Sequence, residues 1–268
     1  MDRAALDAAY NNSAAVPNSA ALMAGFRARS DALRAKQGRH LDLRYGPDER
    51  NRIDYFAAPS PGPVLVFIHG GYWQMRAKED FSFLANGPLA HGIHVALVGY
   101  TLAPAKSLAT IVAEVQSAIG WLADRVADFH GDPARCFVSG WSAGAHLAAL
   151  SLDEPAVRGG LAISGIYDLE PVRLCYVNEK LRLDAAEARR LSPLHCVAAQ
   201  SAPLVIAYGM DELPELQRQS ETFAAARAMA GRPGKLAPLA GHNHFTILEE
   251  LASPDGALTT LVRELVAD

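Results

Sequence analysis

One segment decides the fold of this chain: Cys136-Phe137-Val138-Ser139-Gly140-Trp141-Ser142-Ala143-Gly144-Ala145-His146-Leu147. An apolar, β-prone run leads into the pattern Gly-x-Ser-x-Gly, and small helix-forming residues follow at once. This order is typical of a nucleophile elbow, in which a strand, a sharp turn and a helix place a residue such as Ser142 at the tip. Gly140 and Gly144 suit that turn, because a Cβ at either position would collide where the strand meets the helix. A Gly-rich turn with an incidental serine is the alternative that five residues alone leave open.

Length and composition indicate a globular protein without a nucleic-acid partner. The chain has 268 residues, which predicts one large domain with a sizeable core. Hydrophobic residues make up 50% and charged residues 20%, as in ordinary globular proteins. The net charge is -4, with both signs interspersed and no basic run of the kind that binds phosphate backbones. The three cysteines form no Cys-x-x-Cys pair, so we expect neither a disulfide framework nor a zinc knuckle.

The location is predicted from what the sequence lacks. Charged residues stand near the N-terminus, where a secretory signal peptide needs an apolar core. Elsewhere, no segment reaches the roughly 18 apolar residues of a membrane span. We therefore expect a cytoplasmic protein with no membrane partner.

The first part of the chain predicts an arm and a hairpin. Residues 1–38 are rich in Ala, Asn, Arg and Ser and predict an N-terminal arm with one helix near Ser19–Lys36. Two alternating segments, 40–46 and 52–56, flank a turn-forming Gly-Pro-Asp sequence. Alternation with one wet face favours an antiparallel hairpin at a sheet edge.

From residue 64 onward, continuous apolar strands alternate with helices. The strands lack polar alternation, as strands covered on both faces should, and are Val64–Ile68, Val95–Val98, Gly160–Ser164 and Leu204–Tyr208. A long helix between residues 107 and 128 has an apolar stripe. This pattern predicts an α/β fold with a mostly parallel central sheet flanked by helices. About residues 168–200 interrupt the pattern and predict a small helical cap inserted into a single domain, 1–268.

A Gly-Gly loop follows the first of these strands, in the sequence His69-Gly70-Gly71-Tyr72-Trp73-Gln74. Two glycines at the carboxyl end of a parallel strand let a backbone N–H point at a site there, as in the oxyanion loops of lipases and esterases. The amides of Gly70 or Gly71, together with that of Ala143, are therefore the candidate oxyanion hole, and His69 braces the loop. A plain Gly-Gly turn is the alternative.

A serine is a poor nucleophile by itself, so Ser142 requires an acid and a histidine later in the chain. Two neighbouring carboxylates, Asp211 and Glu212, follow one predicted strand, and His242 and His244 follow the next. Side chains at neighbouring extended positions point in opposite directions, so only one of the two carboxylates can reach the imidazole. Aspartate is the commoner triad acid, which favours Asp211. A metal site on the histidines is disfavoured, because no ligand spacing such as His-Glu-x-x-His is present.

The loop at 69–74 and the Ser-Ala-Gly-Ala-His-Leu sequence at 142–147 together resemble the kynurenine formamidase (arylformamidase) family of α/β-hydrolases. Tyr-Thr-Leu-Ala-Pro at 100–104 is similar to a segment of esterases of the hormone-sensitive lipase group. Those esterases usually have a third glycine where this chain has Tyr72. The resemblance runs from about residue 45 to the C-terminus, and it departs from the family at Trp141, where a histidine is expected before the nucleophile.

The resemblance implies an α/β-hydrolase fold and a set of roles for the residues above. In the family the histidine precedes phenylalanine, which indicates His244 as the base, with His242 as the weaker alternative. The family's acid stands three residues after a glycine and two before a proline, a register that selects Glu212, with Asp211 as the alternative. The expected catalytic residues are therefore Ser142, Glu212 and His244.

The implied activity is that of a serine hydrolase acting on a small acyl group. The resemblance implies an aryl formamide such as N-formylkynurenine as substrate, cleaved to formate and amine in tryptophan catabolism, through an acyl-enzyme and with no metal or cofactor. Tyr72, Trp73 and Trp141 are candidates for framing an aromatic leaving group, and core packing is the alternative for each. A short-chain carboxylesterase and an inactive binding protein of the same fold are the other functions considered. A small-molecule acyl compound is the expected partner, and the oligomeric state, a homodimer included, stays open.

Overall fold

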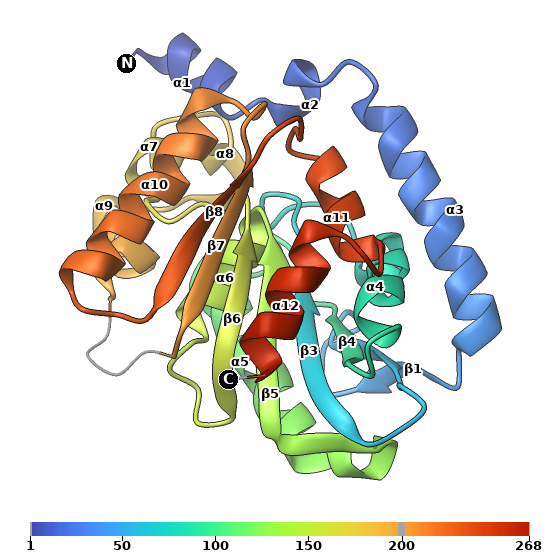
Figure 1. The fold of residues 1–268 in the computed structure, drawn as a ribbon. Coiled ribbons are helices and arrows are strands. Elements are labelled where there is room, and N and C mark those ends of the chain that lie inside the picture. The colour runs from blue at the N-terminus through green and yellow to red at the C-terminus, as the bar shows by residue number, and fades with distance from the viewer. Residues whose placement is uncertain (1, 198–201, 268) are drawn as a thin grey trace.

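The computed structural model describes residues 2–197 and 202–267 and has a central sheet with helices on both faces (Figure 1). The strands of the described part are β1 His40–Arg44, β2 Arg52–Phe56, β3 Gly62–Ile68, β4 His94–Val98, β5 Gly131–Trp141, β6 Val157–Ile163, β7 Leu204–Gly209 and β8 Gly234–Leu239. They form one sheet in the order β1-β2-β4-β3-β5-β6-β7-β8. From β4 to β8 all neighbours run parallel, whereas β1 pairs with β2, and β2 with β4, in antiparallel fashion. The α/β-hydrolase fold and the antiparallel N-terminal hairpin expected from the sequence are confirmed.

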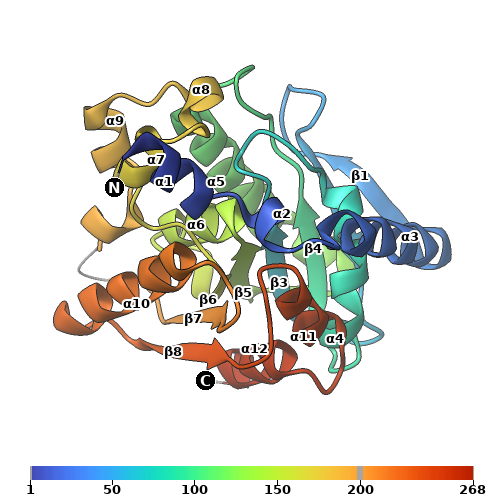
Figure 2. The same ribbon diagram turned by 90° about the horizontal axis from the view of Figure 1, so that it is seen from above.

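Twelve α-helices connect and cover these strands in the described residues. They are α1 Arg3–Ala9, α2 Asn12–Ala15, α3 Ser19–Gln37, α4 Asn86–Leu89, α5 Leu108–Arg125, α6 Ala143–Leu150, α7 Glu170–Arg173, α8 Asn178–Leu181, α9 Ala185–Arg190, α10 Pro214–Met229, α11 Glu249–Ala252 and α12 Ala257–Ala267. Seen from above, α5, α6 and α10 lie on one face of the sheet and α3, α4, α11 and α12 on the other (Figure 2). None of the helices in residues 2–197 and 202–267 combines the length and apolar character needed to cross a membrane.

The core is divided between the two faces by the strand period. In β3, Val64, Val66 and Ile68 pack into the cluster that contains α5, α6 and α10. The alternate residues Leu65 and Phe67 pack into the cluster under α3, α11 and α12. Successive side chains of a strand point to opposite faces, so a fully apolar strand is what a sheet with two covered faces requires.

The cap and the arm both lie above the carboxyl ends of the parallel strands (Figures 1 and 2). The expected insertion contains α7, α8 and α9, and its last residues, 198–200, lie outside the described part of the chain. The expected helix near Ser19–Lys36 is α3, while α1 and α2 precede it and run across the top of the molecule toward the cap. Because the carboxyl ends of parallel strands are where ligands bind in such sheets, the arm and the cap are placed to enclose a site.

Candidate active site

The turn between β5 and α6 has the geometry of a nucleophile elbow. Ser142 has φ 57° and ψ -119°, in the left-handed half of the backbone map that residues other than glycine rarely occupy. Its amide donates to the carbonyl of Ile163 at 2.8 Å, which ties the turn to β6. A Cβ on Gly140 would lie 2.2 Å from the carbonyl oxygen of Gly144, and one on Gly144 would lie 2.0 Å from that of Ile68. The glycine spacing is therefore a steric requirement of the turn.

Glu212 and His244 are joined behind this turn. Nδ1 of His244 donates to Oε2 of Glu212 at 2.9 Å, and the two residues are 3% and 6% exposed, respectively. The other carboxylate oxygen, Oε1, accepts from the amide of Gly209 at 2.7 Å and from the hydroxyl of Ser164. Three donors on two oxygens hold the carboxylate in a single orientation. The arrangement leaves Nε2 of His244 as the nitrogen that is free to accept a proton.

Trp141 fixes the other side of the His244 loop. Its indole N–H donates to the backbone carbonyl of His244 at 2.8 Å, and the two rings lie 4.9 Å apart between centroids. The residue before the serine, where the resemblance led us to expect histidine, thus positions the histidine loop through its side chain. An indole N–H needs an acceptor when it is buried, and this carbonyl supplies one.

The alternatives to Glu212 and His244 point elsewhere. Asp211 is exposed, and its carboxylate has no hydrogen bond or ion pair among the described residues. The imidazole of His242 lies 3.4 Å from Oε1 of Glu250, away from the Glu212 carboxylate. Of the two carboxylates and two histidines left open by the sequence, the structure brings Glu212 and His244 together.

Ser142 and His244 line the same small cavity, of about 30 Å³. The lining residues are Asn12, Ser13, Gly71, Tyr72, Met75, Arg76, Trp141, Ser142, His244 and Phe245. Within residues 2–197 and 202–267 the side-chain hydroxyl of Ser142 forms no hydrogen bond. Hydrogen bonds between catalytic groups are often long in ligand-free enzymes and tighten when substrate binds.

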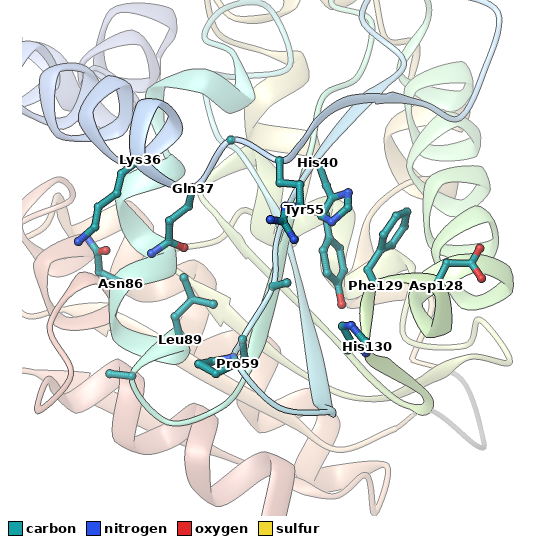
Figure 3. Close-up of a pocket in the computed structure, with 15 residues that line it drawn as sticks. Lys36, Gln37, His40, Tyr55, Pro59, Asn86, Leu89, Asp128, Phe129 and His130 are labelled. Carbon is teal, nitrogen blue, oxygen red and sulfur yellow. The ribbon is translucent and has the colours of Figure 1, made fainter.

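A much larger cavity, of about 900 Å³, lies between the end of α3 and the segment before β5 (Figure 3). His40, Tyr55 and Phe129 form part of its wall. None of Ser142, Glu212 and His244 lines it. Size alone would select this cavity, but the nucleophile geometry and the Glu212–His244 pair place the candidate chemistry in the small one.

The Gly-Gly loop is packed against the elbow. A Cβ on Gly70 would lie 2.7 Å from the Trp141 carbonyl oxygen and 3.1 Å from Cβ of Ser142. Gly71 has φ +114°, and its added Cβ would meet the carbonyl oxygen of Met75 at 2.3 Å. The amides of Gly70, Gly71 and Ala143 have no acceptor in the described part of the chain. Three backbone donors without acceptors beside a serine hydroxyl are suited to bind a developing oxyanion.

His69 braces this loop from below. Its Nδ1–H donates to the carbonyl of Gly70 at 2.8 Å, and its ring stacks on Tyr100 at 4.3 Å between centroids. Burial lowers the pKa of His69 to about 4, so the imidazole is neutral near pH 7. A neutral, fully buried ring that hydrogen-bonds the loop backbone is a structural support, as expected from the sequence.

The aromatic residues predicted to frame the substrate divide into two groups. Tyr72 and Trp141 line the cavity. The prediction for Trp73 is wrong, because its side chain is 0% exposed and packs edge-on against His146 at 5.0 Å between centroids, inside the core. Tyr72 and Trp73 are neighbours in a turn, so one ring faces the site and the other faces the interior. The alternative of core packing was therefore correct for Trp73.

Tyr72 connects the site to the N-terminal arm. Its hydroxyl donates to the carbonyl of Tyr10 and accepts from Nδ2 of Asn12 at 3.0 Å. Burial raises the pKa of Tyr72 well above its usual value, so this hydroxyl stays protonated. Tyr176 of the cap meets Tyr72 edge-on at 6.4 Å between centroids. Arm, cap and loop thus converge on one side chain.

Several lining residues were not predicted from the sequence, namely Asn12, Ser13, Met75, Arg76 and Phe245. Ser164, which hydrogen-bonds Glu212, was also missed. A polar residue at the carboxyl end of a core strand is a signal that could have identified Ser164. For Asn12 and Ser13 no local signal exists, because they lie in a polar arm more than a hundred residues from the elbow.

Known proteins resemble the chain over most of its length. A family model described as BD-FAE matches residues 56–153. Kynurenine formamidases from Danio rerio and Salmo salar are 31% and 32% identical to the chain, and each match covers 84% of the chain and 81% of the relative. The crystal structure of a candidate thioesterase from Silicibacter sp. TM1040 superposes with a TM-score of 0.86 at 29% identity, covering 96% of this chain and 98% of that one.

These relationships extend beyond a shared fold. The two kynurenine formamidases are more than 30% identical to the chain, and each match covers more than two thirds of both proteins. A match of that length spans the loop at 69–74 and the elbow at 140–144, where the candidate chemistry lies. The relatives are hydrolases by name, and the fold of the chain is the α/β-hydrolase fold. The chain is therefore a hydrolase and belongs to the kynurenine formamidase family.

Proposed function

We propose that this hydrolase cleaves an aryl formamide of the N-formylkynurenine type to formate and an aromatic amine, with Ser142, His244 and Glu212 as its catalytic triad. The observation that carries the proposal is the 2.9 Å hydrogen bond from His244 to Glu212, beside the cavity that His244 shares with Ser142. Membership of the kynurenine formamidase family supports the choice of a formamide.

The first half-reaction transfers the acyl group to the enzyme. Nε2 of His244 takes the proton of the Ser142 hydroxyl as the oxygen attacks the formyl carbon. Glu212 stays ionised and stabilises the imidazolium that forms, while its hydrogen bond keeps Nδ1 protonated and Nε2 free. The imidazolium then gives its proton to the leaving nitrogen, and the amine departs from a formyl-enzyme.

The oxyanion of the tetrahedral intermediate is bound by backbone amides. Ala143 supplies one N–H from the start of α6, and the Gly70-Gly71 loop supplies the other, since these amides have no acceptor among the described residues. One such donor is commonly worth about 3 kcal/mol in the transition state. In the second half-reaction, a water activated by His244 attacks the formyl-enzyme and releases formate.

The dimensions of the cavity support a one-carbon acyl group. Its volume of about 30 Å³ is small, only about two to three times the roughly 10–15 Å³ that a cavity needs to hold one water molecule. Buried Trp141 and Phe245 close it beside Ser142, and Tyr72 stands where related esterases have glycine. A formyl group fits beside Ser142 with its leaving group directed toward the exposed residues Ser13 and Met75, whereas a long acyl chain requires the walls to move.

A short-chain carboxylesterase activity is the second candidate. It is favoured by the likeness over 96% of the chain to a candidate thioesterase, whose substrate also contains an acyl group on a good leaving group. The proposed attack on a carbonyl is the same for esters and formamides, so the difference lies in how the leaving group is bound.

Turnover of N-formylkynurenine and of p-nitrophenyl acetate, measured side by side, tests the proposal. We expect a higher kcat/KM for the formamide, and loss of both activities by about 10⁴-fold or more in Ser142→Ala with the fold retained. A variant that kept a tenth of the wild-type rate would exclude Ser142 as nucleophile. A preference for the ester by orders of magnitude would select the carboxylesterase instead.

A further inference from the structure

Arg76 is a cation in the wall of the candidate catalytic cavity, and no side chain in the described part of the chain is paired with it. It lines the same cavity as Ser142 and His244, and its side chain is partly buried. Within the described residues its guanidinium donates no hydrogen bond and forms no ion pair. Partial burial lowers the pKa of Arg76, although the group remains fully charged at neutral pH. Its nitrogens are not fully buried, so the guanidinium can meet an anion that enters the cavity from solvent.

The carboxylate that acts on Arg76 electrostatically is that of Asp80, and it is already engaged. Oδ1 of Asp80 accepts from the guanidinium of Arg27 at 3.2 Å, and Oδ2 accepts from the amide of Ala77 at 3.0 Å. Asp80 therefore attracts Arg76 without forming an ion pair with it. The donors of Arg76 remain available on the side of the cavity.

The backbone holds Arg76 against the oxyanion loop. Arg76 has φ +75°, and its carbonyl accepts from the guanidinium of Arg50 at 2.6 Å. A Cβ on Gly71 would lie 2.7 Å from Cγ of Arg76, so the aliphatic stem lies directly over Gly71. Arg76 and Gly71 thus line the cavity side by side.

The cavity has a closed end and an open end. Trp141, Ser142, His244 and Phe245 are buried and form the closed end, whereas Ser13 and Met75 are exposed. An acyl group on Ser142 must occupy the closed end. The leaving group then extends toward the open end, along the wall that contains Arg76.

We propose that Arg76 binds a carboxylate on the leaving group of the substrate, so that the enzyme selects acyl compounds whose leaving group is an anion. This inference rests on the acyl transfer at Ser142 proposed above, and not on whether the scissile bond is an amide or an ester. A guanidinium binds a carboxylate through two parallel hydrogen bonds, which gives orientation as well as affinity. The anion would thereby align the scissile carbonyl with the serine.

Matched substrates that differ in one charge provide the test. One pair is N-formylkynurenine and its α-carboxamide, and the other is 3-carboxyphenyl acetate and phenyl acetate. The quantity measured is the ratio of kcat/KM for the charged member to that for the neutral member. Arg76→Gln should lower this ratio by about 10- to 100-fold, mainly through KM, and Arg76→Lys should recover part of it because the charge remains without the planar fork. Added NaCl should lower the ratio in the wild type much more than in Arg76→Gln.

Arg263→Gln is the matched control. Arg263 is an exposed residue of α12 that does not line the cavity. Replacing it with glutamine changes the net charge by the same amount as Arg76→Gln, but away from the site. Its ratio should equal that of the wild type, which separates direct binding from long-range attraction. A fall as large as that in Arg76→Gln would overturn the proposal.

Two further results would overturn it. One is an unchanged ratio in Arg76→Gln, and the other is an equal loss on charged and neutral substrates, which would mean that Arg76 only supports the Gly71 loop. Failure of the formamide proposal would give a different result. The wild type would then hydrolyse neither N-formylkynurenine nor its carboxamide, while the ratio of kcat/KM for the two phenyl acetates would still measure the effect of Arg76.

Discussion

The imidazole of His244 donates from Nδ1 to Oε2 of Glu212 across 2.9 Å, with both side chains withdrawn from solvent. Water cannot compete for this hydrogen bond, and the carboxylate is itself held by the amide of Gly209 and the hydroxyl of Ser164. The ring can therefore present only Nε2 to the cavity. Proton transfer from a serine needs this fixed tautomer and orientation.

Isosteric amide substitutions should separate Glu212 from its neighbour. Glu212→Gln keeps the shape but removes the charge that stabilises the imidazolium, so kcat should fall by about 10⁴-fold. Asp211→Asn changes an exposed carboxylate and should leave kcat within about twofold of the wild type. Steady-state kinetics of both variants on one substrate provide the measurement. The reverse pattern would assign the role to Asp211.

Acyl-chain length should be limited by Tyr72. In the wild type, kcat/KM for p-nitrophenyl esters should decrease steadily from acetyl to octanoyl, since the cavity is only about 30 Å³. Tyr72 has φ 51°, a conformation that glycine adopts without strain. Tyr72→Gly should therefore remove the ring without straining the backbone and leave more room for the acyl chain. We expect the ratio of kcat/KM for the butyryl ester to that for the acetyl ester to rise by about tenfold, which corresponds to about 1.4 kcal/mol. Rates that increase with chain length in the wild type would contradict this account.

Two glycine-to-alanine substitutions should shift stability in opposite directions. In Gly144→Ala the new Cβ would lie 2.0 Å from the carbonyl oxygen of Ile68, so the elbow has to move, at a cost of about 3 kcal/mol or more. Gly120→Ala, at an exposed position of α5, meets no atom within 4 Å and should gain about 1 kcal/mol from helix propensity. Urea denaturation of the two variants provides the comparison. Equal midpoints would argue against the close packing of the elbow.

Stability should decrease between pH 6.5 and pH 4 because of buried neutral histidines. Burial lowers the pKa of His146 to about 4, while its ring donates to the carbonyl of Leu191 at 2.8 Å. In the unfolded chain a histidine titrates near 6.5, so the unfolded state binds more protons in this range and gains stability as the pH falls. At pH 5 the cost is about 2 kcal/mol for this residue, and His69 should contribute similarly.

His146→Gln tests this assignment, because glutamine retains a donor for Leu191 without titrating. The free energy of unfolding should change less between pH 7 and pH 5 in the variant than in the wild type, by about 2 kcal/mol. The same dependence in both proteins would show that other groups cause it. Measurement above pH 5 avoids most of the titration of the carboxylates.

Local sequence determined the architecture and the elbow turn at Ser142. Gly140 and Gly144 are needed because the strand and the helix of the elbow approach too closely for a Cβ. Fully apolar strands need helices on both faces of the sheet, and this need does not depend on distant parts of the chain. Such requirements are satisfied within a few residues, which explains why the elbow, the parallel sheet and the α3 helix were predictable. The choice of Glu212 came from the register of the family that the chain resembles, since strand alternation shows only that Asp211 and Glu212 cannot both reach one imidazole.

Only the tertiary structure decided which side chains share the site. Tyr72 and Trp73 are equivalent in sequence, yet one lines the cavity and the other is enclosed by the core, since the direction of a turn depends on what it packs against. Asn12 reaches the cavity only because the arm folds over the carboxyl ends of the strands. Arg76 is one of many arginines in the sequence, and it becomes distinctive through the partners that folding places around it. Proximity across long stretches of chain is a property of packing, and no local pattern encodes it.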